Sequence, residues 1–241
     1  METSEIKDFY NTNLQKIDIP YEQQRWFKSP QTKAGYDNTK SALTTYALPH
    51  IGDAVDVLEF GPGPGTWTKC LLKKAPHAHY DLVDISEEML KQASFALSDY
   101  TNIQYITSDI LDFKPKKQYD FFLSSRIIEY VPQKDRAIQT IAQSLKSGAY
   151  GYLVTKTPQY KRIFGKPISS PMHRHQVSPS VLTKLLTQNG CVVCKTIHVT
   201  CVFPLAHSGV LDRLLTKLCR LLPFTLSLPV SESYAIVFQK K

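Results

Sequence analysis

Short apolar runs alternate with helix-like segments along most of the chain. The predicted strands cover residues 55–60, 79–85, 103–110, 119–125, 150–157, 191–203 and 233–241. Between them, helical spacing or capping residues predict helices over about 66–74, after Ser86, over about 133–145, and from Ser178 or Ser180 to about 188. Short strands that are apolar throughout and separated by helices indicate an α/β protein whose mostly parallel sheet is covered on both faces.

The alternation also predicts how the chain is organised. Residues 1–50 are expected to form a helical N-terminal cap or lid, interrupted at Pro20 and Pro30. Residues 51–241 are expected to form the core domain, and residues 204–231 an insertion between its last two strands. A length of 241 residues suits one large domain of this kind.

Charged residues are distributed unevenly along the chain. The net charge is +8, but residues 1–130 carry 14 basic and 18 acidic side chains, whereas residues 131–241 carry 15 basic and 3 acidic ones. The C-terminal part is therefore predicted either to attract anions or to present an ordinary solvated basic surface.

The chain shows no pattern typical of secretion or of a membrane span. Its first residues, "METSEIKDFYNTN", lack the apolar core of a signal peptide, and no apolar run reaches the ~18 residues of a transmembrane helix. The cysteines are scattered, and the pair in Cys191-Val-Val-Cys194 would point to opposite faces of a strand. We expect a reduced, cytoplasmic protein with no structural metal.

A glycine-rich turn, Gly61-Pro62-Gly63-Pro64-Gly65, joins the first strand to a helix. Glycines at such a turn let the backbone approach a ligand, and the helix N-terminus offers free N–H groups. Asp84, at the end of the next strand, stands where a ribose-binding acid belongs. The spacing departs from the G-x-G-x-x-G of nicotinamide-binding proteins, so a nicotinamide cofactor, a methyl donor and a plain tight turn all remain open.

Four linked motifs resemble those of class I S-adenosylmethionine (AdoMet) methyltransferases that act on small molecules, sugars and lipids. In order, they are "VLEFGPGPGTWT", "YDLVDISEEML", "IQYITSDILDF" and "YDFFLSSRIIEYVP". The C-terminal "SYAIVFQKK" is similar to the reversed last strand of that family. The resemblance implies a Rossmann-like class I fold with a mostly parallel seven-stranded sheet, and AdoMet as cofactor.

The resemblance also implies a set of cofactor-binding residues. The glycine loop would hold the methionine part, Asp84 both ribose hydroxyls, Ile85 and Met89 the adenine ring, and Asp109 with the Ile110 N–H the adenine edge. Ser125 and Arg126 would lie beside the methyl group. The full set is Glu59, Gly61, Gly63, Gly65, Asp84, Ile85, Met89, Asp109, Ile110 and Ser125.

Catalysis by methyl transfer requires mainly an aligned acceptor, and a hydroxyl acceptor also benefits from a base. Candidate bases are His173, His175 and Glu129, with Tyr21 and Tyr36 in the expected lid. Each histidine also fits a solvated loop, and Glu129 also fits an ion pair with Arg126.

The motifs that are missing narrow the acceptor. No N-P-P-Y-like tetrapeptide follows the fourth strand, and no Pro-Cys nucleophile is present, so nucleic acid is disfavoured. The basic loop after the fifth strand favours a small anionic or glycan- or lipid-linked acceptor, held by Arg126, Arg162 or Arg174 with Tyr21 and Tyr36. Transfer to oxygen is preferred; the alternatives are an NAD(P)-dependent oxidoreductase and a non-catalytic AdoMet-binding regulatory subunit.

Within the insertion, residues 208–222 form a predicted amphipathic helix. Its leucines recur at helical spacing, with basic residues between them: Leu211, Leu214, Leu215, Leu218, Leu221 and Leu222. The stripe is predicted to pack onto the domain, to form a homodimer, or to make peripheral contact with an anionic membrane.

Overall fold

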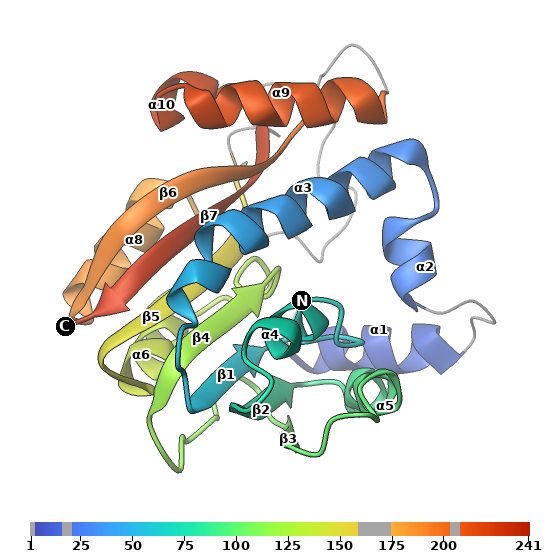
Figure 1. The fold of residues 1–241 in the computed structure, drawn as a ribbon, viewed down its shortest axis with the longest axis vertical. Coiled ribbons are helices and arrows are strands. Elements are labelled where there is room, and N and C mark those ends of the chain that lie inside the picture. The colour runs from blue at the N-terminus through green and yellow to red at the C-terminus, as the bar shows by residue number, and fades with distance from the viewer. Residues whose placement is uncertain (1–2, 16–20, 159–174, 203–207) are drawn as a thin grey trace.

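The computed structural model describes residues 3–15, 21–158, 175–202 and 208–241 (Figure 1). Seven strands form one sheet in the order β3-β2-β1-β4-β5-β7-β6. They are β1 (Asp56–Phe60), β2 (His79–Asp84), β3 (Ile103–Thr107), β4 (Tyr119–Ser125), β5 (Leu145–Lys156), β6 (Cys191–Cys201) and β7 (Ser231–Lys240). Only β7 runs antiparallel to its neighbours β5 and β6. The predicted Rossmann-like methyltransferase fold with a reversed last strand is confirmed.

Helices cover both faces of the sheet. The described helices are α1 (Thr3–Gln15), α2 (Tyr21–Trp26), α3 (Pro30–Tyr46), η1 (Leu48–His50), α4 (Thr68–Lys74), α5 (Glu87–Ala96), α6 (Lys134–Gln143), α8 (Pro179–Gln188), α9 (Gly209–Leu221), α10 (Phe224–Ser227) and η3 (Leu228–Val230). Successive strand residues point to opposite faces, so Val57 joins one core cluster and Leu58 the other. The first cluster lies beneath α3, α4 and α5, and the second beneath α6 and α8.

Several predicted boundaries move by a few residues. Ser178, not Ser180, caps α8, because its side chain accepts a hydrogen bond from the Val181 N–H. The helix predicted to run to residue 145 ends at Gln143 in α6, and Leu145 already pairs with Tyr119 across β4 and β5. Strand pairing therefore ends this helix two residues earlier than predicted.

The N-terminal helices have two different roles. Within α3, Ala42 and Leu43 are fully or almost fully buried in the sheet core, so this helix is part of the packed domain. By contrast, α1 and α2 contribute Ile6, Tyr10 and Arg25 to the edge of a large cavity. Part of the predicted 1–50 cap therefore borders the cavity, and its role as a lid stays a prediction.

The insertion helix α9 packs on α3 and β6, but not by its leucines. Its buried residues are small or polar, namely Gly209, Asp212, Thr216 and Cys219. The prediction that the leucine stripe packs onto the domain is wrong, since Leu214 is 52% exposed and Leu218 59% exposed. A Cβ at Gly209 would lie 2.3 Å from the Pro30 carbonyl oxygen, which shows how closely α9 begins against α3.

Candidate active site

The glycine turn takes a left-handed backbone path from β1 toward α4. Gly61, Gly63 and Gly65 have φ values of 67°, 56° and 83°. Residues that carry a side chain rarely adopt this left-handed backbone conformation. A Cβ at Gly61 would lie 2.1 Å from Ile127 Cδ1, whereas one at Gly63 would meet nothing closer than Met89 Sδ at 3.9 Å. The first glycine is therefore required by packing as well as by backbone conformation, and the second leaves space beside Met89.

A cavity of about 1140 Å³, including space open to solvent, lies at the carboxyl ends of β1, β2 and β4. It brings together residues that are distant in the sequence. Predicted site residues among its lining are Gly61, Gly63, Asp84, Ile85, Met89, Asp109, Ile110, Ser125, Arg126 and Tyr21. Ligands of open α/β sheets bind at this edge, where the strand order reverses.

Other predicted residues lie next to the cavity without lining it. Glu59 is buried beneath the glycine turn, Gly65 is buried at the end of the turn, and Glu129 is fully buried behind Arg126. Tyr36 stacks on Trp67 with ring centroids 5.4 Å apart, so it supports the cavity wall from behind. His175 is partly buried and is not among the residues that line a described cavity, and His173, Arg162 and Arg174 lie outside the described residues.

Asp84 is held by two backbone N–H groups. Ser86 N–H donates to Oδ1 at 2.9 Å, and Gly63 N–H donates to Oδ2 at 3.3 Å. Burial raises the pKa of Asp84 to about 6, against the lowering effect of these hydrogen bonds. The carboxylate is therefore oriented toward the cavity and retains lone pairs for a ligand's hydroxyl groups.

Glu59 lies on β1 directly below the glycine turn. Thr68 Oγ1 donates to its Oε2 at 2.7 Å, while its buried Oε1 has no hydrogen-bond partner among the described residues. Burial raises the pKa of Glu59 to about 8, and the nearby Asp84 charge also raises it. A buried carboxyl group with an unpaired oxygen is unusual in a core without a functional reason.

The far wall of the cavity is shaped by the start of α5 and the end of β3. Ser86 caps α5, since its hydroxyl accepts from the Met89 N–H, and this brings Met89 into the lining. Asp109 Oδ1 accepts from the Leu111 N–H at 2.9 Å, which fixes the turn that carries Ile110. This wall therefore combines the apolar side chains of Met89 and Ile110 with the oriented carboxylate of Asp109. Such a lining can bind a flat ring that has polar groups at its edge.

Arg126 follows β4 at the centre of the site. Among the described non-glycine residues, it alone has a positive φ, 69°. Its Nε lies 3.6 Å from Glu129 Oε1, and its buried Nη1 has no hydrogen-bond partner within the described chain. Backbone strain combined with an unpaired guanidinium nitrogen is typical of a residue positioned for a ligand.

A second cavity, of about 960 Å³ including open space, adjoins the first and shares Arg25, Trp26 and Arg126 with it. Glu232 lines its wall and lies 3.2 Å from Lys156 Nζ. Although burial alone would raise the pKa of Glu232, the charges of Lys156, Arg126 and Arg25 lower it to about 2. The boundary between the cavities therefore contains two arginines, Arg25 of α2 and Arg126 after β4, and Lys156 of β5 pairs with Glu232 in the wall of the second cavity.

Several aromatic and charged lining residues were not among the predicted site residues. Tyr10, Arg25, Trp26 and Tyr130 all border the first cavity, and the Tyr10 hydroxyl lies 3.4 Å from that of Tyr130. The sequence offered two weak signals: the mixed aromatic and polar stretch "YEQQRWF" contains Arg25 and Trp26, and the motif "YDFFLSSRIIEYVP" contains Tyr130. Neither segment distinguished these residues from their neighbours.

Comparison with known proteins agrees with the motifs. Residues 57–148 match a family described as a methyltransferase domain. Trans-aconitate 2-methyltransferase of Enterobacter sp. (strain 638) is 30% identical over 133 residues, which cover 55% of this chain and 51% of that protein. Malonyl-[acyl-carrier protein] O-methyltransferase 2 of Ilyobacter polytropus is 28% identical over 96 residues, covering 40% and 37%. The chain thus matches about a third to a half of the length of these curated relatives.

Solved structures extend the similarity to the whole fold. The N-methyltransferase NodS of Bradyrhizobium japonicum, in complex with S-adenosyl-L-homocysteine, has a TM-score of 0.61 at 16% identity and covers 95% of this chain and 97% of its own. Magnesium protoporphyrin IX methyltransferase of Synechocystis has a TM-score of 0.68 at 14% identity, with both chains fully covered. The recognition made from the motifs is confirmed: residues 57–148 belong to the methyltransferase domain family, within a class I AdoMet-dependent methyltransferase fold.

Proposed function

We propose that this chain is an AdoMet-dependent methyltransferase that transfers a methyl group to an oxygen of a small carboxylate acceptor. The observation that carries the proposal is the continuity of the two cavities at Arg126. The first cavity contains the glycine loop and Asp84, and the second begins at the same guanidinium group. Such an arrangement holds two reactants side by side, which is the main requirement of methyl transfer.

The first cavity fits AdoMet by the chemistry of its lining. Asp84 would accept hydrogen bonds from the ribose hydroxyls, Met89 and Ile85 would contact the adenine ring, and Asp109 would accept from its amino group. The space left at Gly63 admits the ligand against the loop backbone. When bound, AdoMet supplies a sulfonium methyl group that is already activated for transfer.

The second cavity supports an anionic acceptor. Arg25 and Arg126 enter it from α2 and the end of β4. The planar guanidinium group of an arginine can bind a carboxylate through two parallel hydrogen bonds, and Arg126 Nη1 has no other described partner. The two curated relatives named above are described as acting on trans-aconitate and malonyl-[acyl-carrier protein], both of which carry carboxylates.

An ionised carboxylate is itself a nucleophile, so this acceptor requires no protein base. Glu129 then acts as a positioning residue: Thr155 Oγ1 donates to its Oε2 at 2.8 Å, and its Oε1 faces Arg126 Nε. The predicted bases His173 and His175 have no necessary role. A glycan- or lipid-linked acceptor held by Arg162 or Arg174 stays a prediction, since both residues lie outside the described ranges.

The proposal is tested by incubating the protein and AdoMet with a panel of di- and tricarboxylic acids and their neutral amides. The release of S-adenosylhomocysteine is measured for each compound. We expect turnover with at least one acid and none with its amide. Arg126→Lys keeps the charge but loses the two-pronged contact, so acceptor KM should rise about tenfold or more. Arg136→Lys, at an exposed position on α6, is the matched control. AdoMet binding without turnover on any acid would instead support a regulatory subunit.

A further inference from the structure

The helix α9 presents its apolar face to solvent. On α9 and the following α10, seven large apolar side chains are between 41% and 83% exposed, namely Val210, Leu211, Leu214, Leu218, Leu221, Leu222 and Leu226. In Figure 1, α9 and α10 form the outer edge of the molecule beyond α3. Scattered exposed leucines are ordinary, but a continuous stripe on one helix face marks an interaction surface.

The orientation of α9 is fixed by polar contacts on its other face. Thr216 Oγ1 accepts from Asn38 Nδ2 at 3.0 Å and from the Cys201 N–H at 2.9 Å. Arg220 donates to the carbonyl oxygens of Asn38 at 2.8 Å and His198 at 2.9 Å. Rotating the helix to bury its leucines would break these buried hydrogen bonds, so the outward face is a feature of the fold.

The two helices on this side of the molecule, α3 and α9, carry a net positive charge. Their basic residues are Lys33, Lys40, Arg213, Lys217 and Arg220, of which Arg220 is directed inward by its hydrogen bonds to Asn38 and His198. Of their two acidic residues, Asp212 is only 6% exposed and Asp37 pairs with both Lys33 and Arg213. Lys217 is exposed on α9, close in sequence to the outward leucines.

We propose that the leucine face of α9 and α10 docks on an anionic lipid surface, with α9 lying in the plane of the membrane interface. An amphipathic helix with leucines on one side and cations beside them has the composition of such interfacial helices. A second copy of this chain would bring two positively charged faces together, which opposes self-association. Within the described ranges, no helix combines the length and apolarity needed to cross a bilayer.

Docking would also place the second cavity near the lipid. The inner side of α9 contributes Asp212 to the wall of that cavity. The proposal does not depend on methyl transfer, because the face, its charges and its orientation exist without a cofactor.

Vesicle flotation of the full chain tests the inference. We expect association with vesicles of phosphatidylglycerol and phosphatidylcholine, and little with phosphatidylcholine alone. Leu214→Glu and Leu218→Glu should each weaken this association about tenfold or more, because an exposed leucine is lost and a negative charge gained. Both side chains are more than half exposed, and circular dichroism would verify folding.

The matched control is Phe95→Glu. Phe95 is 86% exposed on α5, which lies on the opposite side of the molecule from α9 in Figure 1. It should leave vesicle binding unchanged. Failure to bind anionic vesicles, an equal loss with Phe95→Glu, or a leucine-dependent dimer in sedimentation without vesicle binding would each overturn the proposal.

Discussion

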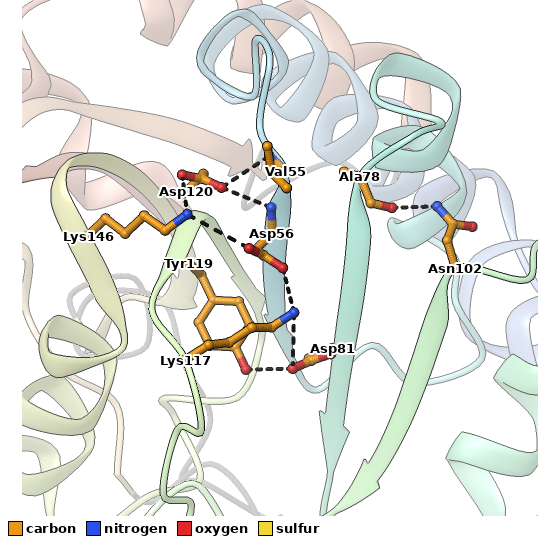
Figure 2. Close-up of polar contacts among 9 residues, drawn as sticks. All are labelled: Val55, Asp56, Ala78, Asp81, Asn102, Lys117, Tyr119, Asp120 and Lys146. Atoms are coloured by element: carbon orange, nitrogen blue, oxygen red, sulfur yellow. Dashed lines mark hydrogen bonds and ion pairs between the residues drawn. The ribbon is translucent and has the colours of Figure 1, made fainter.

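The two ends of the central sheet contain similar polar residues, but they differ in how many of the polar atoms have a hydrogen-bond or ion-pair partner. At the amino ends of β1, β2 and β4, carboxylates and lysines form a closed network (Figure 2). Lys146 Nζ lies 2.9 Å from Asp120 and 3.8 Å from Asp56, and Asp120 also accepts from the Asp56 N–H at 2.9 Å. Asp81 receives the Tyr119 hydroxyl at 2.6 Å.

At the carboxyl ends of the same strands, polar groups are left unpaired. Buried atoms without a described hydrogen-bond partner include Glu59 Oε1, Ser125 Oγ and Arg126 Nη1. The pKa values differ accordingly: burial raises that of Asp84 to about 6, whereas at the amino end burial of Asp120 is outweighed by its hydrogen bond with Lys146, which lowers its pKa. One end stabilises the fold, and the other keeps bonding capacity for ligands.

The largest change in the free energy of unfolding is expected when a glycine at each end of the sheet is replaced by alanine. Gly61 and Gly148 both have positive φ, but a Cβ at Gly61 would overlap Ile127 whereas one at Gly148 meets nothing within 4 Å. Gly61→Ala should lower the free energy of unfolding by about 2–4 kcal/mol, and Gly148→Ala by only about 1 kcal/mol. Urea denaturation measures both. Equal losses would show that backbone strain alone, and not packing at the site, requires Gly61.

The buried carboxyl group of Glu59 is expected to make the stability of the fold depend on pH. Its pKa of about 8 in the folded state exceeds its ordinary value of 4.5. Its contribution to stability is therefore fully present below about pH 4.5 and is lost as pH rises through 8. Glu59→Gln removes this titration, so at pH 7 the variant should be more stable than the wild type by on the order of 3 kcal/mol, and at pH 5 by less than about 1 kcal/mol.

Urea denaturation at the two pH values checks this prediction. The exposed Glu87→Gln on α5 is the matched control and should follow the wild type at both. A Glu59→Gln variant that parallels the wild type from pH 5 to 7 would mean that Glu59 is ionised in the fold.

The smallest change in the free energy of unfolding is expected from a substitution at the amino end of the sheet. Asp120→Asn weakens one ion pair with Lys146 but keeps an oxygen for the Val55 and Asp56 N–H groups. We expect a loss of about 1 kcal/mol in unfolding free energy, because the pair is partly exposed, with AdoMet affinity unchanged. Thermal unfolding and calorimetric titration check the two parts. A large fall in AdoMet affinity would contradict the separation between the two ends.

The sequence predicted those parts of the site that depend on local chemistry. The glycine turn, the Ser86 cap and Asp84 at the end of β2 lie in one continuous strand–turn–helix pattern, so their neighbours in the chain are also their neighbours in space. The apolar strands likewise specified a buried sheet. Gly63 and its partner Asp84 are only 21 residues apart in the chain, and the apolar composition of each strand indicates burial without specifying its partner strand.

The parts that depend on tertiary packing were not predicted. Arg25 reaches the site because α2 folds over the sheet, which no local pattern encodes. The leucines of α9 satisfied the helical pattern of a core-facing stripe, but Asn38 and Thr216 form polar contacts that select the opposite face. A hydrophobic stripe identifies a helix and its two faces, and the partner surface decides which face is buried.

Calorimetric titration of AdoMet and of NAD into the wild type, Asp84→Asn and Asp120→Asn tests the central claim most directly. We predict that the wild type and Asp120→Asn bind AdoMet equally and do not bind NAD. Asp84→Asn should bind AdoMet at least about tenfold more weakly, since the ribose loses a charged acceptor. Binding of NAD in preference to AdoMet, or equal AdoMet affinity in all three proteins, would contradict the assignment of the cavity at the carboxyl end of the sheet.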